Sequence, residues 1–362
     1  MATQRVYNFN PGPAVLPRDV MEQAAAEFVD YRGLGYGLAE ASHRSKEFEE
    51  VIHATEANIR KLMGVPEDYA VLFLQGGASL QFAMVPMNLA VPGKPMVYAD
   101  TGSWSNAAIK EAKLFGDVKL VYDGKASNFT VIGDVGEWQI DQNAAYLYLC
   151  SNNTIEGTEY RFFPDAGSVP LIADMSSDIM SCVVDVSKFA MIFAGAQKNL
   201  GPAGVTVVIM KKELAARAGA KVPTMLKYST HIDKESLYNT PPCIAIYMVR
   251  LVTDWLIKLG GLPAIQRINE AKSDTLYNAI DVSDFYRGTA EAADRSRMNV
   301  TFRLPTEALE EKFGAEAKKA GLIGLKGHRN VGGMRASIYN AMPMEGVSSL
   351  IDFMNEFEAK NR

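Results

Sequence analysis

One lysine interrupts a long apolar stretch of this sequence. Lys198 is the only charged residue in the segment 189–210, and it lies where one strand-like apolar run ends and another begins. Burial of an ammonium group is costly, so this lysine needs either a paired charge or a pKa low enough to leave the amine neutral and nucleophilic. A neutral buried amine forms Schiff bases readily. Lys198 is therefore the first candidate for a catalytic residue.

A second candidate ends another apolar run. Asp174 follows Leu171-Ile-Ala, and we expect its carboxylate to reach the same crevice as Lys198. A lysine with a buried aspartate suggests pyridoxal phosphate, because the aspartate keeps the pyridine nitrogen protonated while the lysine holds the aldehyde carbon. The alternative is a strand-end aspartate and a lysine that extends its charge to solvent. These two segments alone leave both interpretations open.

Two further features suit a ligand of this kind. Residues 75–79, Gln-Gly-Gly-Ala-Ser, follow a predicted strand and open a predicted helix, where small residues let backbone N–H groups approach a phosphate. No Gly-Lys-Ser/Thr follows, which argues against a Walker loop, and a tight turn is the alternative. Trp104 begins a helix after the next strand, where α/β proteins place ligands. It could stack on a planar ring or fill a core.

Two of the four histidines are followed directly by arginine. The pairs are His43-Arg44 and His328-Arg329, and Arg335 lies nearby on a strand that otherwise reads as buried. The planar fork of arginine matches carboxylate or phosphate, and an adjacent imidazole adds a donor, so such pairs suit dianionic groups. For either pair alone, a solvated loop charge is the alternative.

Composition sets limits on the class of protein. The chain has 362 residues, enough for two lobes that share a crevice, with 48% hydrophobic and 22% charged residues and a net charge of -5, which disfavours nucleic acid as a partner. The apolar stretch around Lys198 is broken by polar residues, glycines and a proline, so we expect no membrane span. The three cysteines are far apart and show no Cys-x-x-Cys spacing, so we predict no metal site and a reduced, cytoplasmic location without a leader peptide.

The order of apolar runs predicts an α/β fold. The expected strands form a mainly parallel, fully buried sheet and cover residues 70–75, 95–99, 118–122, 145–150, 171–175, 189–194 and 205–210. Helical spacing marks 19–31, 48–63 and 244–259. The last of these ends at Gly260-Gly261, which Pro263 follows, and we place the domain boundary there. Strand candidates 298–304 and 334–339 then alternate with helical segments 307–320 and 346–360, as in a smaller α+β lobe.

Together these segments resemble one family, the phosphoserine aminotransferases, in the class V, fold-type I group of pyridoxal-phosphate enzymes. The resemblance spans nearly the whole chain and rests on residues 8–17, 43–48, 75–79, 102–105, 152–158, 173–177, 195–199, 238–242 and 327–329. It implies a large cofactor-binding domain with a seven-stranded sheet over 17–261, a small α+β domain over 262–362, and an N-terminal arm over 1–16 that closes over the site.

The resemblance also implies how the cofactor is held. Lys198 carries it as a Schiff base and moves protons, Asp174 pairs with the pyridinium nitrogen, and Trp104 stacks on the ring. The remaining contacts implied are with the phosphate through Gly77, Ala78 and Gln197, with the ring hydroxyl through Thr154, and with the phosphate from a neighbouring subunit through Asn239 and Thr240. A homodimer with shared sites follows.

The substrates implied are small dianionic amino acids and their oxo acids. Arg335 matches the group that binds the α-carboxylate, whereas His43, Arg44, His328 and Arg329 match the groups that receive the phosphate or distal carboxylate. One pocket would thus serve phosphoserine and 3-phosphohydroxypyruvate as well as glutamate and 2-oxoglutarate in a ping-pong transamination of serine biosynthesis. The 3-hydroxy-2-oxo-4-phosphate precursor of vitamin B6 has the same phosphate handle, and the sequence leaves that second activity open.

Three other functions are alternatives for this sequence. A cysteine desulfurase needs a reactive cysteine on a mobile loop, but Cys150 and Cys182 lie in or beside apolar runs and Cys243 follows two prolines at a helix start. A small-substrate transaminase, of the alanine or serine with glyoxylate type, would not need two His-Arg pairs. A non-catalytic, cofactor-binding dimer with a regulatory role would not need Lys198, Asp174 and Arg335 together.

Overall fold

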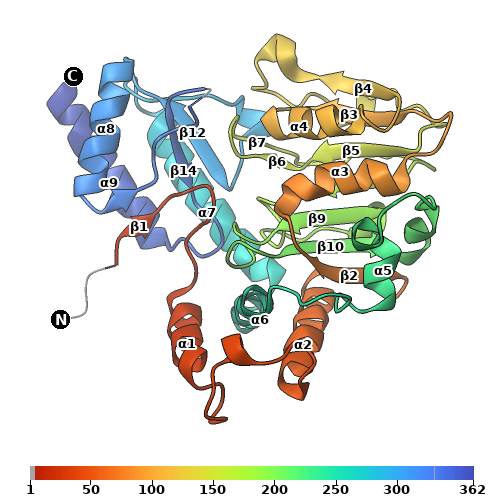
Figure 1. Cartoon of the computed structure of the whole chain (residues 1–362). Helices are drawn as coiled ribbons and strands as arrows, with labels where there is room; N and C mark the ends of the chain where they lie inside the picture. Colours follow the sequence, from red (N-terminus) through yellow and green to blue (C-terminus); the bar gives the residue numbers. More distant parts are fainter. Residues whose placement is uncertain (1–4, 330) are drawn as a thin grey trace.

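The computed structural model describes residues 5–329 and 331–362 and is built around a seven-stranded sheet (Figure 1). The strand order is β2-β10-β9-β8-β5-β3-β4, and β10 runs antiparallel to both its neighbours while the other neighbouring strands are parallel. The strands are β2 (Tyr69–Leu74), β3 (Met96–Asp100), β4 (Val118–Asp123), β5 (Tyr146–Cys150), β8 (Leu171–Asp174), β9 (Met191–Gly195) and β10 (Thr206–Lys211). The predicted α/β fold with a mainly parallel sheet is confirmed, and each predicted strand is present.

One expectation about the sheet is wrong. We predicted that every strand is fully buried, but no residue of β4 is, and Lys119 and Leu120 are exposed. The reason is its surroundings: β4 is an edge strand that pairs only with β3, and in the described part of the chain it lacks the close helix packing by which α2 (Lys46–Met63) and α5 (Tyr228–Asp233) bury the other edge strand, β2. Its run of valine, leucine and tyrosine resembles a central strand, because the sequence of one strand does not say how many neighbours it has.

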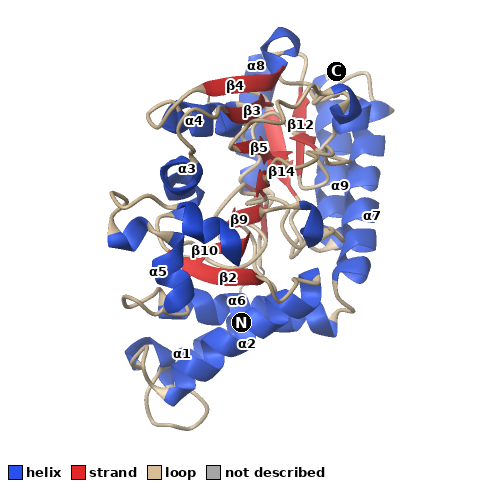
Figure 2. Cartoon of the chain, turned by 90° about the vertical axis from the view of Figure 1, so that its right-hand side faces the viewer, coloured by secondary structure: helices blue, strands red, loops and turns tan. Residues whose placement is uncertain are grey.

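Helices cover both faces of the sheet (Figure 2). One core cluster joins α3, α4 and α5 to one face, and another joins α2 and α6 to the opposite face. The α-helices are α1 (Arg18–Val29), α2 (Lys46–Met63), α3 (Gly77–Leu89), α4 (Ser103–Ala112), α5 (Tyr228–Asp233), α6 (Cys243–Lys258), α7 (Leu262–Asp281), α8 (Glu307–Lys319) and α9 (Met344–Asn361). Short 3-10 helices are η1 (Leu38–Glu40), η2 (Gly124–Ser127), η3 (Val135–Glu137), η4 (Val186–Lys188), η5 (Lys212–Arg217), η6 (Thr224–Leu226) and η7 (Ala292–Asp294).

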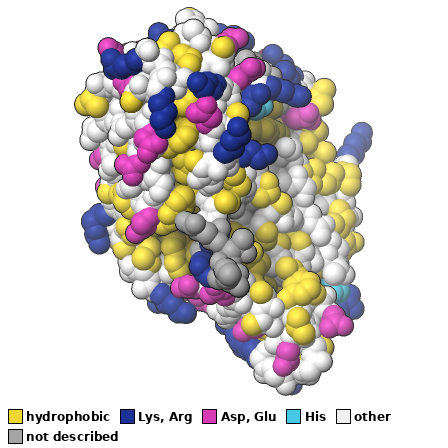
Figure 3. All heavy atoms as spheres, turned by 90° about the vertical axis from the view of Figure 1, so that its left-hand side faces the viewer, with side chains coloured by type: hydrophobic (Ala, Val, Ile, Leu, Met, Phe, Trp, Pro, Cys, Tyr) yellow, Lys and Arg dark blue, Asp and Glu magenta, His cyan; other side chains and the backbone are white. Residues whose placement is uncertain are grey.

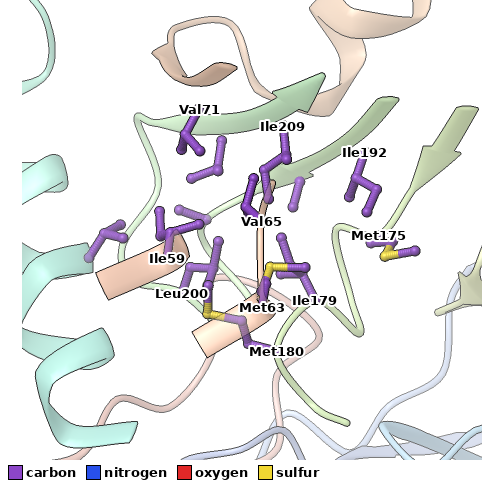
Figure 4. Close-up of a cluster of buried hydrophobic side chains, with 14 of the residues drawn as sticks. Ile59, Met63, Val65, Val71, Met175, Ile179, Met180, Ile192, Leu200 and Ile209 are labelled. Atoms are coloured by element: carbon purple, nitrogen blue, oxygen red, sulfur yellow. The ribbon is translucent and has the colours of Figure 1, made fainter. Parts of the chain in front are cut away.

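The core beneath α2 anchors the loops that carry the candidate catalytic residues (Figure 4). Met175 directly follows Asp174, and Leu200 lies two residues after Lys198; both side chains are buried in this cluster with Ile59 of α2. Close packing in a core leaves few alternative positions for such side chains. Lys198 and Asp174 are thus attached to fixed backbone.

The C-terminal part of the chain has its own antiparallel sheet. It consists of β11 (Arg287–Gly288), β12 (Asn299–Arg303) and β14 (Met334–Ser337) and packs with α8 and α9 in a third core cluster. The smaller strand pairs are β1 (Tyr7–Asn8) with β13 (Leu322–Ile323) and β6 (Asn152–Asn153) with β7 (Thr158–Glu159).

Sequence reasoning missed the longest helix, α7, which starts directly after Gly261. From the sequence, Pro263 predicts the end of α6, but proline is also favoured in the first turn of a helix, and in the structure it lies in the first turn of α7. The start of α7 contributes Leu262 and Ile265 to the large core, and its end contributes Leu276 and Ile280 to the C-terminal core. Because one helix serves both cores, the domains 17–261 and 262–362 stay a prediction.

The N-terminal segment crosses between the two parts of the molecule. Its strand β1 pairs with β13, and the backbone then reaches Gln197, whose carbonyl accepts a hydrogen bond from the N–H of Ala14 at 2.9 Å. The carbonyl of Pro11 accepts another from the hydroxyl of Tyr339 at 2.7 Å. These contacts place part of the predicted arm 1–16 beside the Lys198 loop, whereas residues 1–4 lie outside the described residues. Closure of the arm stays a prediction.

Candidate active site

A cavity of about 260 Å³ lies at the carboxyl ends of the parallel strands. Asp174 ends β8, Cys150 ends β5, and the loops after β2 and β3 supply the starts of α3 and α4. The lining comprises Pro11, Gly12, Gly77, Ala78, Ser79, Phe82, Trp104, Cys150, Asn152, Thr154, Ile155, Asp174, Ser176, Ser177, Gln197, Lys198, His328 and Arg335. Open α/β sheets place ligands at this edge, so the cavity is the first candidate for a binding site.

Lys198 extends into this cavity from the turn between β9 and β10. Its Nζ lies over the Trp104 ring, 5.9 Å from the ring centroid. Burial lowers the pKa of the Lys198 amine, although the nearby Asp174 carboxylate opposes this shift. The side chain is only partly exposed, and it lines the cavity. A larger fraction of neutral, nucleophilic amine results, which corresponds to the second of the two alternatives considered for this lysine.

Asp174 is held in place by Ser176. Its Oδ1 accepts hydrogen bonds from the Ser176 backbone N–H at 2.9 Å and from the Ser176 hydroxyl at 2.6 Å. Burial raises the pKa of the Asp174 carboxyl, and the charge of Lys198 and the bonds from Ser176 oppose that shift. Among the residues that the structure describes, Oδ2 has no hydrogen-bond partner. The carboxylate therefore has one fixed oxygen and one that can accept from a ligand.

Thr154 connects Trp104 to Arg335. The indole Nε1 donates to the Thr154 hydroxyl at 2.9 Å, and Arg335 Nη1 donates to the Thr154 carbonyl at 2.7 Å. Arg335 is only 6% exposed, and its buried Nε has no partner in the parts of the chain that the structure describes. A buried donor without a partner is costly, so this guanidinium is placed to receive an anion.

The start of α3 forms a cradle. Gly76 has φ 87°, and a Cβ on it would lie 2.5 Å from Leu80 Cδ2, so a side chain there is excluded. At Gly77 the same atom would meet nothing within 4 Å, which leaves open space in front of the helix N-terminus. Gln197 and Gly12 lie next to each other, since a Cβ on Gly12 would lie 3.5 Å from Gln197 Cγ, and both line the same cavity as Gly77. The cradle suits a phosphate.

These features together fit pyridoxal phosphate. An open cradle at a helix N-terminus suits its phosphate, the Trp104 face suits its ring, and Asp174 supplies a free carboxylate oxygen for its ring nitrogen. Lys198 supplies the amine. The predicted contacts of Gly77, Ala78, Thr154 and Gln197 with this cofactor stay predictions, although all four residues line the cavity.

Five predicted residues do not line the cavity within one chain. His43 and Arg44 precede α2, and Arg44 is exposed. The side chain of Asn239 and the carbonyl of Thr240 contact the side chain of Gln75, just before the cradle. Arg329 is exposed and lines a separate cavity next to α8. By contrast, His328 and Arg335 both line the cavity that contains Lys198.

Sequence reasoning left some lining residues without a role. Ser176 fixes Asp174, and the signal available for it was its position two residues after the aspartate. Asn152 donates to Ser177 Oγ and to Asn299 Oδ1, both at 2.7 Å, and so connects the cavity wall to β12. Pairings of that kind join residues far apart in the sequence, so no local pattern reveals them.

A second buried acid, Asp178, lies behind the cavity. Burial and the nearby Glu159 raise the pKa of Asp178 to about 8. The Ser151 hydroxyl lies 2.5 Å from Asp178 Oδ1 and 3.0 Å from the carbonyl of Asp174. One hydroxyl proton cannot serve both acceptors, but a protonated Asp178 donates to Ser151, which then donates to Asp174. The geometry thus agrees with a neutral Asp178.

The cysteines lack the properties of a nucleophile. Cys150 lines the cavity from β5, but burial raises the pKa of its thiol well above the usual range. Burial likewise raises the pKa of Cys182, to about 12, and that of Cys243. A thiol rather than a thiolate is a poor nucleophile. Over residues 5–329 and 331–362, no cluster of His, Cys, Asp and Glu side chains is suited to hold a metal ion.

Comparison with known proteins identifies the family. Residues 6–350 match the model of the family described as aminotransferase class-V, so the chain belongs to the class-V aminotransferases. Phosphoserine aminotransferase of Desulfatibacillum aliphaticivorans is 55% identical over 359 residues, which cover 99% of each protein. The predicted resemblance is confirmed.

Solved structures agree. Phosphoserine aminotransferase from Bacillus circulans subsp. alkalophilus is 50% identical, matches 99% of both chains and has a TM-score of 0.97. A PLP-bound phosphoserine aminotransferase from Trichomonas vaginalis is 37% identical over 97% of this chain and 100% of that chain, with a TM-score of 0.90. The predicted fold-type I architecture is therefore confirmed. Within the described ranges, no helix has the length and hydropathy needed to span a membrane.

Proposed function

We propose that this protein is a pyridoxal-phosphate-dependent phosphoserine aminotransferase. It would interconvert 3-phosphohydroxypyruvate plus glutamate with phosphoserine plus 2-oxoglutarate. The observation that carries the proposal is the convergence of Lys198, Asp174 and Arg335 on one cavity. Full-length identity of 55% to a phosphoserine aminotransferase supports it.

The cofactor, when bound, supplies a protonated ring that accepts the electron pair left when the substrate Cα loses its proton. Gly77, Ala78 and Gln197 would hold its phosphate, and Thr154 would hold its ring hydroxyl. Trp104 would cover one face of the ring and exclude water from it. Asp174 would fix the proton on the ring nitrogen, because a carboxylate in a site of low polarity strongly favours a cation beside it.

Lys198 would move the proton. Burial lowers the pKa of its amine, which raises the fraction of neutral amine that can accept a proton from the substrate Cα. The Lys198 loop is fixed by the core cluster and by the Ala14 bond to the Gln197 carbonyl. A fixed amine avoids the cost of ordering it at the moment of proton transfer.

The substrate would be held at both ends. Arg335 has a buried Nε without a partner in the described ranges, which suits the α-carboxylate. His328 lies on the lining between this cavity and the neighbouring one, where a distal phosphate or carboxylate would reach. Arg329 would assist there. The vitamin B6 precursor, with the same phosphate, is a second candidate substrate of this pocket.

A half-reaction tests the proposed function. Phospho-L-serine added to the cofactor-loaded protein is expected to convert the cofactor to its aminated form, with a change in absorbance, far faster than L-alanine or L-serine does. Preferential reaction with alanine or serine would instead identify a small-substrate transaminase. Release of sulfide from L-cysteine would identify a desulfurase, and no reaction with any amino acid would contradict an enzymatic role.

We further propose that the protein is a homodimer in which His43, Arg44, Asn239 and Thr240 act in the partner's site. These residues do not line the cavity of their own chain. The segment before His43 exposes apolar side chains, namely Phe28, Val29 and Leu34. This segment lies at the lower end of the molecule, where Figure 3 shows hydrophobic side chains at the surface. A partner subunit that covered them would bring Arg44 to the next site.

Complementation tests the shared site. Chains with Lys198→Ala and chains with Arg44→Ala are co-expressed with different tags, and the mixed dimer pool is assayed at low phosphoserine concentration. If Arg44 serves the partner, one of two sites in each heterodimer is intact and about a quarter of wild-type activity returns. If Arg44 serves its own chain, no site is intact and activity stays at the level of the variants.

We also propose a cytoplasmic location. The three cysteines are free in the structure: Cys150 is buried in the lining of the candidate active site, and Cys182 and Cys243 are partly buried. Free thiols are typical of a reducing compartment, which supports this location.

A further inference from the structure

The buried carboxylate of Glu310 lies outside the candidate active site but contacts the segment that leads into it. Glu310 is on α8, is 8% exposed, and lines the neighbouring cavity of about 970 Å³ together with His328. Its Oε1 accepts from Arg303 Nε at 2.6 Å and from the Leu304 N–H at 3.3 Å. Its Oε2 accepts from the Gly333 N–H at 3.1 Å. Both oxygens are thus used, and one of them holds the backbone just before Arg335.

Arg303 adds a second contact to the same stretch of backbone. From β12 its Nη1 donates to the carbonyl of Val331 at 2.9 Å. A Cβ on Gly333, whose φ is 70°, would lie 2.7 Å from Arg303 Cδ, so the arginine stem packs directly on this glycine. Arg303 and Glu310, which form an ion pair, therefore hold the backbone at Val331 and at Gly333, on either side of Gly332.

The backbone that these two side chains hold is the C-terminal side of a narrow loop, whose two sides are hydrogen-bonded to each other at Gly327 and Gly333. The Gly327 N–H donates to the Gly333 carbonyl at 2.8 Å, and the His328 carbonyl accepts from the N–H groups of Val331 and Gly332 at 3.0 and 2.8 Å. A Cβ on Gly327 would lie 2.1 Å from the Gly332 carbonyl oxygen, so the two sides touch. The position of His328 therefore depends on where Gly333 is held.

The same loop leads directly to Arg335, which is expected to bind the other end of the substrate. Two residues after Gly333, the Arg335 N–H donates to the Leu325 carbonyl at 2.8 Å. His328 and Arg335 line one cavity and are expected to bind opposite ends of one substrate. The distance between the His328 and Arg335 side chains is therefore set by the short backbone segment that Glu310 and Arg303 hold.

We propose that Glu310 and Arg303 are positioning residues that set the spacing between the two anion-binding groups and thereby select amino donors with two anionic ends. The proposal rests on the proposed function. Glu310 needs its charge for this role, because both oxygens accept from N–H donors. Glutamine would turn an N–H₂ group toward either the guanidinium or the Gly333 N–H, which leaves a donor facing a donor.

Glu310→Gln tests the proposal. We expect kcat/KM for O-phospho-L-serine and for L-glutamate to fall about tenfold or more, as for loss of a charged hydrogen bond. The slow reaction with L-alanine, which has no distal anion, is expected to change less than about twofold, because Arg335 alone binds it. Arg303→Lys keeps the charge but loses the fork to Val331, and it is expected to show the same selectivity change in a smaller degree. Glu311→Gln, an exposed neighbour with the same change of charge, is the matched control and should behave as the wild type.

Hydrogen exchange of the substrate-free holoenzyme gives a readout that does not depend on activity. Peptides covering 324–336 are expected to exchange faster in Glu310→Gln than in Glu311→Gln, since the Gly333 and Gly327 amides lose protection. An equal loss of kcat/KM for alanine and phosphoserine would mean a merely structural role and overturn the proposal, as would unchanged selectivity. If the wild type does not prefer phosphoserine, the proposed function fails. Unchanged hydrogen exchange in Glu310→Gln would instead show that Glu310 does not hold the backbone at Gly333.

Discussion

Replacing Lys198 with alanine is expected to lower kcat for phosphoserine by about 10⁴-fold or more, because a positioned proton-transfer group alone typically contributes a factor of roughly 10² to 10⁴. The variant also loses its covalent hold on the cofactor. Cofactor binding itself should survive, since the cradle at Gly77, the Trp104 face and Asp174 are unchanged. The Lys198→Ala variant is thus expected to bind the cofactor but to turn over almost no phosphoserine.

The measurement has two parts. Turnover is followed in the half-reaction with phosphoserine, and attachment is followed by borohydride reduction and mass spectrometry, which should place the cofactor on Lys198 in the wild type and on no lysine in the variant. Lys188→Ala removes an exposed lysine ten residues earlier in the chain and serves as the control. Added methylamine should restore part of the activity of Lys198→Ala, because a small free amine can replace the missing base. Turnover near the wild-type level in Lys198→Ala would remove this lysine from the mechanism.

Lys198 was found in the sequence because a charge in a buried run is rare enough to demand a chemical reason. The same physics reveals Asp174 and Arg335, which lie in short apolar strands and are 4% and 6% exposed. The seven strands of the large sheet were found for a related reason: most of them are fully buried, and buried strands leave long apolar runs in the sequence.

Features set by pairing between distant segments were out of reach. The edge position of β4 depends on the absence of a second neighbouring strand, and the helix α7 depends on contacts with two cores. Exposed residues are the hardest case. Arg44 and Arg329 resemble any solvated arginine, and their pairing with histidine left that alternative open until the family resemblance gave them a role. Glu310 was missed because a glutamate on an amphipathic helix normally faces water.

A second large effect is expected at Asp174. Asp174→Asn keeps an oxygen that can accept from Ser176, so the local backbone should hold its position. The other oxygen becomes an N–H₂ group, which faces the ring nitrogen as a donor and no longer stabilises a proton there. Loss of one preorganised electrostatic group costs roughly 10² to 10³ in kcat, and we expect a loss of about 10³-fold with weaker cofactor binding.

The matched control for this substitution is four residues away. Asp178→Asn makes the same chemical change in another buried acid, which burial and Glu159 already keep neutral through a pKa of about 8. Its amide can donate to Ser151 as the protonated acid does, so kcat should stay within about threefold of the wild type. If Asp174→Asn and Asp178→Asn lower kcat equally, the effect of Asp174 is one of packing in the wall behind the cavity. If only Asp174→Asn lowers it, and the cofactor dissociates more readily as well, the charge that faces the ring nitrogen is the cause, because both acids are buried and undergo the same chemical change.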